Sequence, residues 1–161
     1  MPRPLMSDPL VTLRRVSGGR SRFIPLLLEA DGSESVLRAY LDQGELYELV
    51  SSDAPIGVVL LVPAKQDALE IKNIALGVEQ RGRGLGRAAI EAIVDLARTR
   101  SAKCLLVGTA DSSSGTAAFY RACGFRDAGR IEGFFDDYPE PVIEDGVRAH
   151  DMLRFEMVLG R

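Results

Sequence analysis

The segment from Ile74 to Ala97 constrains this chain most, because an apolar run passes through a glycine-rich turn into an amphipathic helix. Gly82, Gly84 and Gly86 stand at every second position before that helix. Glycine leaves its backbone amide uncovered and adopts angles that other residues avoid. The first amides of a helix have no partner within it, and the helix dipole makes this end positive. The segment therefore predicts an anion site, most often one for phosphate.

Three arginines support this prediction. Arg81, Arg83 and Arg87 lie before, between and after the glycines, so each adds a full positive charge beside the free amides. We interpret residues 82–87, called the glycine loop below, as a clamp for a pyrophosphate group.

Length and composition limit the class of protein. The chain has 161 residues, 46% of them hydrophobic and 27% charged, so we expect one globular domain over residues 1–161. Residues 1–9 carry three prolines and are expected to be frayed. A net charge of −3 gives no general attraction to nucleic acid or to a membrane surface. The sequence has neither a signal peptide nor the roughly 20 apolar residues of a membrane helix, so we expect a cytoplasmic protein.

The few cysteines and histidines exclude several kinds of site. Cys104 and Cys123 lie far apart in apolar segments, and we expect both to be reduced, buried thiols. His150 is the only histidine, so a Cys/His zinc site is not available and no metal is expected.

The hydrophobic pattern predicts an α/β, or mixed α+β, fold with the element order β α α β β β α β α β β. Short turns join the three strands of residues 45–78, which is typical of an antiparallel meander. The expected strands are 10–16, 45–51, 56–62, 68–78, 103–109, 125–131 and 152–159, and the expected helices are 22–30, 36–42, 85–99 and 115–122.

A dinucleotide is one candidate ligand, because residues 84–89 satisfy the pattern Gly-x-Gly-x-x-Ala. That motif normally follows its strand at once and opens the first of several βαβ units. Here residues 79–81 intervene, and about 80 residues of other structure precede the motif. The acidic residue expected about 20 positions later is also missing, since Asp111 lies 27 residues after Gly84. A Walker loop is excluded because no Gly-Lys-Ser/Thr follows.

Another pattern covers more of the chain. Residues 76–86, Leu-x4-Arg-Gly-x-Gly-x-Gly, resemble the acyl-CoA-binding motif of the GNAT (Gcn5-related) N-acetyltransferases. Residues 113–120, Ser-x6-Tyr, with Cys-Gly-Phe at 123–125, resemble the second motif of this family. Ser113 and Thr116 stand where asparagine and alanine are common in that motif. The order of strands and helices is similar over essentially the whole chain.

The resemblance implies a central mixed, mostly antiparallel sheet of about seven strands flanked by about four helices. It implies an acyltransferase that moves the acetyl group of acetyl-CoA to a primary amine by direct attack in a ternary complex. The acceptor is not specified by the sequence, and a cationic small molecule or a peptide amine would fit. A homodimer is compatible with the resemblance. A non-catalytic acyl-CoA-binding module and a small dinucleotide-binding protein stay open as alternatives.

The resemblance also assigns roles to residues. Tyr120 matches the general acid that protonates the departing sulfur, whereas Phe119 is expected in the core. Glu70 is the candidate general base, with Glu79 and Asp111 as other options. The expected cofactor contacts are Leu76, Gly77, Val78, Arg81, Gly82, Arg83, Gly84, Leu85, Gly86, Arg87, Ser113 and Tyr120.

The resemblance also implies a bulge, at Asn73 or Gly77, that splays the strand before the glycine loop and leaves its backbone groups free for the pantetheine arm. Asn73 is a candidate to orient the substrate or a water. Residues 132–151, called the acidic connection below, carry many carboxylates and few cations. We interpret this segment as a lid that attracts a cationic amine, with Asp136, Asp137 and Tyr138 as substrate contacts; a solvated charged surface is the alternative.

Overall fold

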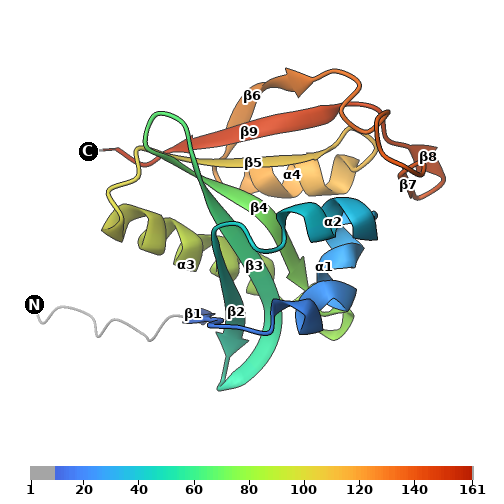
Figure 1. The fold of residues 1–161 in the computed structure, drawn as a ribbon. Helices are drawn as coiled ribbons and strands as arrows, with labels where there is room; N and C mark the ends of the chain where they lie inside the picture. The colour runs from blue at the N-terminus through green and yellow to red at the C-terminus, as the bar shows by residue number, and fades with distance from the viewer. Residues whose placement is uncertain (1–9, 161) are drawn as a thin grey trace, which may run out of the picture.

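The computed structural model describes residues 10–160, so the N-terminal residues expected to be frayed lie outside the described part. One seven-stranded sheet has the strand order β1-β2-β3-β4-β5-β9-β6 (Figure 1). The strands are β1 (Thr12–Arg15), β2 (Glu45–Ser51), β3 (Ala54–Ala64), β4 (Ala68–Leu76), β5 (Cys104–Ala110), β6 (Arg126–Ile131) and β9 (Met152–Val158).

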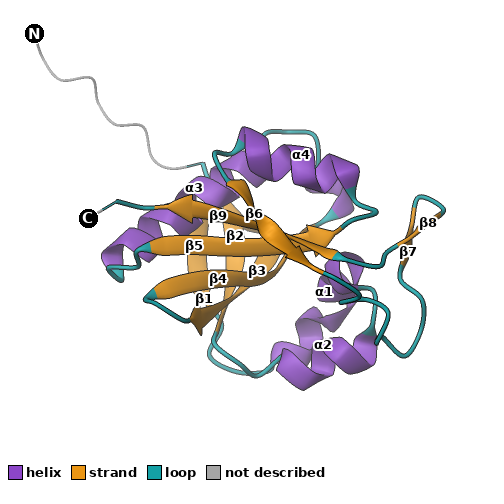
Figure 2. Cartoon of the chain, turned by 90° about the horizontal axis from the view of Figure 1, so that it is seen from above, coloured by secondary structure: helices purple, strands orange, loops and turns teal. Residues whose placement is uncertain are grey.

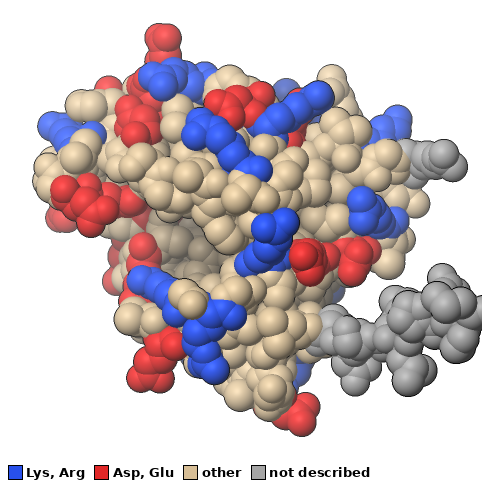
Figure 3. Space-filling model, turned by 180° about the vertical axis from the view of Figure 1, so that it is seen from behind, with Lys and Arg blue, Asp and Glu red and all other residues tan. Residues whose placement is uncertain are grey.

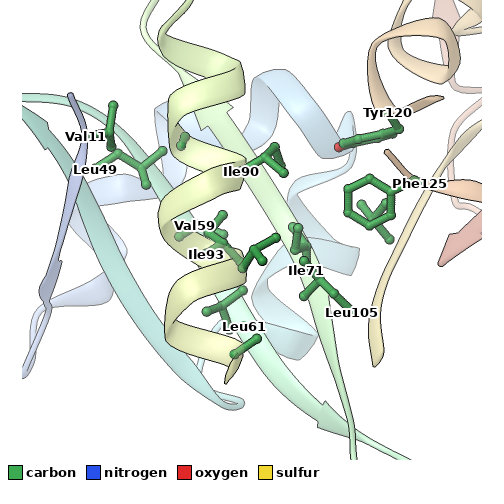
Figure 4. Packing of buried hydrophobic residues seen from close by; sticks show 14 of the residues in the cluster. Val11, Leu49, Val59, Leu61, Ile71, Ile90, Ile93, Leu105, Tyr120 and Phe125 are labelled. Carbon is green, nitrogen blue, oxygen red and sulfur yellow. The ribbon is translucent and has the colours of Figure 1, made fainter. Parts of the chain in front are cut away.

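Helices cover both faces of this sheet (Figure 2). They are α1 (Ile24–Asp31), α2 (Glu34–Tyr40), α3 (Leu85–Thr99) and α4 (Ser114–Ala122), with short 3-10 turns η1 (Arg20–Phe23) and η2 (Val78–Gln80). One buried apolar cluster joins the sheet to α3 and α4 (Figure 4), and a second joins it to α1 and α2. The predicted mixed α/β fold is therefore confirmed.

The amphipathic pattern of α3 explains how this helix packs. Leu85, Ala89 and Ile93 recur at helical spacing and are buried against the sheet, as the sequence predicts. Leu96, the next residue in this stripe, is only partly buried. The stripe fixes the direction of α3 and therefore where the glycine loop at its beginning lies.

The centre of the sheet holds its only parallel pair within residues 10–160. Neighbouring strands pair antiparallel except β4 and β5, whose pairing covers just Ala68–Ile71 and Cys104–Val107. Beyond this point β4 turns away from β5 (Figure 1). The last five residues of β4 therefore have no strand partner on the β5 side, and their backbone groups on that side are open to a ligand.

A bulge explains the divergence of the two strands. Leu60 of β3 faces Asn73, but the next residue, Leu61, faces Ile71, so Lys72 is an extra residue in β4. Such an insertion bends the strand and increases its twist. The irregularity expected beside Asn73 is confirmed, whereas none is found at Gly77.

Two expectations were wrong. β4 ends at Leu76 and not at Val78, because the chain then turns into η2, where the Gln80 amide bonds the Gly77 carbonyl at 2.9 Å. The acidic connection is also not a plain loop, since it contains the hairpin β7 (Ile143–Glu144) and β8 (Val147–Arg148). Within the described residues, no helix is long and apolar enough to cross a membrane.

Candidate active site

A cavity of about 720 Å³ opens where β4 and β5 diverge. Residues 71–76 of β4 and 107–110 of β5 form its sides. The glycine loop and α4 close one part of it, and the end of α1 and the acidic connection close the other. The volume lies within the range of small-molecule binding sites.

The glycine loop presents free amides to this cavity. Within the described part of the chain, no hydrogen bond is donated by the backbone N–H groups of residues 82–87. Gly82 and Gly84 have φ angles of 73° and 76°, and a Cβ built on either would meet nothing within 4 Å. Positive φ is costly for other residues, so glycine is required here by the backbone and not by crowding. Free amides at the start of α3 suit a bound anion.

The three arginines differ in their contacts. Arg81 lines the cavity and donates to Glu29 at 3.2 Å and to the Leu76 carbonyl at 3.3 Å. Arg87 also lines the cavity, whereas the guanidinium of Arg83 bonds the Gln80 side chain and does not.

Several other predicted cofactor contacts have clear positions. Leu76 lines the cavity at the open edge of β4. Gly77 and Val78 instead border a separate hollow of about 480 Å³, and Val78 is 64% exposed. The side chain of Leu85 is buried in the apolar core under α3. The structure therefore brings Leu76 to the cavity and leaves these three residues outside it.

Tyr120 projects from α4 into the cavity wall. The residue is 5% exposed, and its ring packs against Phe119, Phe125 and Phe155 with centroid distances of 5.5, 5.6 and 5.9 Å. Its hydroxyl has no hydrogen-bond partner among the described residues, and Figure 4 shows this oxygen pointing toward α3. Burial raises the pKa of Tyr120 above its ordinary value, so the hydroxyl keeps its proton near neutral pH.

Ser113, just before α4, and Phe119, in the second turn of α4, are two more wall residues. Ser113 is buried, lines the cavity and donates a hydrogen bond from its hydroxyl to Glu144 of the acidic connection. Phe119 also lines the cavity; it is half-buried and packs against the buried cluster, so the expected core position is found in part. A Cβ on Gly86 would lie 3.2 Å from the Phe119 ring, so this glycine allows α3 and α4 to pack closely.

Two of the four predicted acceptor contacts line the cavity, namely Asn73 and Tyr138. Asp136 and Asp137 do not. The carboxylate of Asp136 lies 2.7 Å from the His150 imidazole, and the amide of His150 bonds the Asp111 carboxylate at 3.0 Å. The amide of His150 therefore ties the acidic connection to Asp111, and the ring of the same histidine contacts Asp136 within that connection.

The carboxylates at the cavity are not the ones that the sequence pointed to. Glu70, Glu79 and Asp111 all lie outside its lining, although the role of Glu70 as base stays a prediction. The cavity is lined by three other carboxylates, Glu29, Asp31 and Glu144. Sequence reasoning missed Glu29 and Asp31, which lie in the last turn of α1. The sequence feature that could have pointed to these two residues is their negative charge at the C-terminal end of a helix, where the helix dipole disfavours it.

Neither cysteine has the character of a nucleophile. Both thiols are free and half-buried, so the expected full burial is not found. Burial raises the pKa of the Cys104 thiol and of the Cys123 thiol, and a raised pKa reduces the reactive thiolate. Among residues 10–160, no group of three or more His, Cys, Asp or Glu side chains could hold a metal.

Charged side chains of both signs alternate over the face shown in Figure 3. This face carries no continuous basic stripe of the kind that binds nucleic acid.

Comparisons with known proteins agree with this geometry. Residues 21–125 match the acetyltransferase (GNAT) family. The chain is 32% identical over 135 residues to YvbK of Bacillus subtilis, described as an uncharacterized N-acetyltransferase; the match covers 83% of this chain and 87% of YvbK.

Solved structures are similar along almost the whole chain. A GNAT family acetyltransferase from Elizabethkingia anophelis with acetyl-CoA bound is 33% identical, with a TM-score of 0.84 over 94% of this chain and 99% of that one. A Bacillus subtilis acetyltransferase in complex with CoA is 28% identical, with a TM-score of 0.81 over 92% and 98%. Residues of both sequence motifs line one cavity, and the family and its relatives match most of the chain. The chain therefore belongs to the GNAT family of N-acetyltransferases.

Proposed function

We propose that this protein transfers the acetyl group of acetyl-CoA to a primary amine by direct attack, with both substrates bound in one cavity. The observation that carries this proposal is the arrangement around the divergence of β4 and β5. Free amides of residues 82–87 line one part of the cavity, and Asp31 at the end of α1 lines another. These two parts match the opposite charges of a pyrophosphate and an ammonium.

The residues present fit acetyl-CoA. The glycine loop, with Arg81 and Arg87 beside it, would hold the pyrophosphate, and the open edge of β4 at Leu76 would bond the amides of the pantetheine arm. When bound, acetyl-CoA supplies an activated thioester. Acetyl-CoA and CoA in the two solved relatives support this assignment.

Tyr120 would act as general acid. Its hydroxyl keeps a proton because burial raises its pKa, and no described residue competes for that proton. A hydroxyl held in the wall can therefore donate to the sulfur as negative charge develops on it. Ser113 would support the same end of the cavity through the acidic connection.

The acceptor end favours a cation. Glu29, Asp31 and Glu144 line the cavity, whereas Lys72 is the one lysine in its lining. Tyr138 and other aromatic groups of the acidic connection provide apolar contact beside these charges. A protonated primary amine is therefore the acceptor class that we propose.

The decisive experiment combines binding with turnover. Acetyl-CoA at about 100 times its Kd should stabilise the fold by about 2.7 kcal/mol, which thermal unfolding detects. NADH should produce no such shift. Release of free CoA is then followed with a panel of primary amines. Binding of acetyl-CoA without CoA release from any amine would favour the non-catalytic module, and a shift with NADH alone would overturn the cofactor assignment.

A further inference from the structure

A chain of hydrogen bonds crosses the acceptor wall of the cavity from β4 to α1. The Nδ2 group of Asn73 donates to the Leu27 carbonyl at 3.1 Å and to the Tyr40 hydroxyl at 3.0 Å. The Tyr40 hydroxyl donates to Oδ2 of Asp31 at 2.5 Å. Because a carbonyl can only accept, the Leu27 contact fixes which end of the Asn73 amide is nitrogen.

This direction leaves an acceptor without a donor. Asn73 is 6% exposed, and its Oδ1 atom is buried with no hydrogen-bond partner in residues 10–160. An unsatisfied buried acceptor is costly, so such atoms normally have an explanation. Asn73 lines the cavity, so a donor of a bound substrate is the candidate partner for this oxygen.

Asp31 has further acceptor capacity in the same wall. Its Oδ1 accepts from the Ser33 amide at 3.2 Å and its Oδ2 from Tyr40. An ionised carboxylate offers about four lone-pair positions, so two are still available. Asp31 also lines the cavity.

The fold stabilises the negative charge of Asp31 poorly. Asp31 is the last residue of α1, where the helix dipole is negative. Burial raises its pKa, and the Tyr40 and Ser33 hydrogen bonds and the charge of Lys72 only partly oppose this. Burial and the charge of Asp31 raise the pKa of Tyr138 in the acidic connection.

The other carboxylates of the cavity already have partners. Glu29 pairs with Arg81 at 3.2 Å, and Glu144 accepts from Ser113. Lys72 lies over the Tyr40 ring, 5.0 Å from its centroid, and makes no ion pair with Asp31. Of the three carboxylates, Asp31 is therefore the one that a cationic substrate would stabilise most.

We propose that Asp31 and Asn73 together bind the ammonium group of the acceptor, and that Asp31 takes the first proton this group must lose. This proposal rests on the function proposed above. The ammonium loses two of its three protons. Asp31 accepts one and passes it to water. The neutral nitrogen then forms the C–N bond while the C–S bond breaks. The second proton that the nitrogen loses returns to Tyr120, and it replaces the proton that Tyr120 has given to the sulfur.

The surroundings also define the acceptor class. Phe135, Tyr138 and Val142 form an apolar part of the same wall. A carboxylate on the substrate, next to the ammonium bound at Asp31, would be repelled by the charge of Asp31. The site therefore fits a primary amine on an apolar or aromatic stem, without a carboxylate beside the nitrogen.

Phenethylamine and phenylalanine are a matched pair of probes, because they differ only in that carboxylate. CoA release is measured with each between pH 6 and 9.5 for the wild type, Asp31→Asn and Asp31→Glu. Asp42→Asn is the matched control, since Asp42 is an exposed residue outside the cavity lining. Thermal unfolding with and without acetyl-CoA reports folding and cofactor binding for each variant.

We expect the wild type to use phenethylamine and reject phenylalanine. In Asp31→Asn, kcat/KM for phenethylamine falls by about 10- to 150-fold, the range for loss of a charged hydrogen bond. Without this carboxylate the variant depends on amine that is already neutral, so its kcat/KM rises more steeply with pH than that of the wild type, while the shift with acetyl-CoA is unchanged. Asp31→Glu keeps the carboxylate and therefore keeps the wild-type pH dependence, and Asp42→Asn behaves as wild type.

Three results would overturn the proposal. The first is a kcat/KM in Asp31→Asn within threefold of the wild type, with the same pH profile. The second is equal use of phenylalanine and phenethylamine. The third is a steeper rise of kcat/KM with pH in Glu70→Gln but not in Asp31→Asn. If the wild type binds acetyl-CoA and acetylates no amine at all, the proposed function fails and this proposal fails with it.

Discussion

Replacing Tyr120 by phenylalanine should separate catalysis from stability. The substitution removes one oxygen and keeps the ring, which packs against three other aromatic rings at 5.5 to 5.9 Å. The hydroxyl has no partner among the described residues, so its loss leaves no donor or acceptor orphaned. We therefore expect the free energy of unfolding to change by less than about 1 kcal/mol.

Turnover should respond much more strongly. A positioned general acid contributes about 10²- to 10⁴-fold, which corresponds to about 2.7–5.4 kcal/mol of activation free energy. The assay is CoA release with saturating acetyl-CoA and a productive amine, beside chemical denaturation of the same samples. The affinity for acetyl-CoA should change little, because the loss concerns the transition state.

Tyr47→Phe is the matched control with the opposite expectation. Tyr47 is also buried, but its hydroxyl accepts from Arg100 at 2.9 Å and donates to Glu45 at 3.3 Å, outside the cavity lining. Its removal should cost about 1 kcal/mol of stability and leave turnover unchanged. Turnover within threefold of wild type in Tyr120→Phe, or equal losses in both variants, would refute the assignment of the general acid.

Three further predictions follow from the same geometry. Gly84→Ala places a side chain at a φ of 76° in open space, so it should lower the free energy of unfolding by about 1–2 kcal/mol and reduce the thermal shift with acetyl-CoA. Gly18→Ala is the control, because this glycine has neither a positive φ nor crowding, and it should change neither quantity. The double variant Cys104→Ala, Cys123→Ala should keep wild-type turnover, and a large loss would point to a covalent acyl-enzyme. Because burial raises the pKa of Asp31, the folded state binds more protons here than the unfolded state, so this charge costs stability above that pKa. The melting temperature of Asp31→Asn relative to wild type should therefore rise between pH 4 and pH 7, and a fall would contradict this sign.

Local pattern explains most of the fold. The period of the apolar residues in α3 and the β-branched run of β3 predict those elements nearly to their ends. The end of β4 was missed because the apolar pattern continues to Val78, while the backbone already turns into η2 through the bond from the Gln80 amide to the Gly77 carbonyl. The hairpin β7–β8 was missed because each of its strands has only two residues and no apolar alternation.

The bulge at Lys72 could be predicted only in part. The resemblance predicted an irregularity near Asn73, but propensity alone contains no sign of it, since residues 68–76 read as one continuous strand. Which residue is inserted depends on the register with β3, a tertiary property. This single residue turns β4 away from β5 and so creates the cavity.

The cofactor end of the cavity could be predicted from the sequence better than the acceptor end, for a physical reason. The cofactor end is built from backbone amides of one continuous segment, residues 82–87, so the order of glycines in the sequence specifies its geometry directly. The acceptor end is built from side chains of α1, β4 and the acidic connection, which meet only in the folded chain. Each of these groups has an ordinary interpretation when considered alone: Asp31 ends a helix, and Asn73 lies within a strand. Only the hydrogen bonds that link both residues to Tyr40 show that they belong to one site. Relatives that share the glycine loop can therefore differ in acceptor, and the residues that contact the Asp31–Tyr40–Asn73 chain are where such differences should be sought.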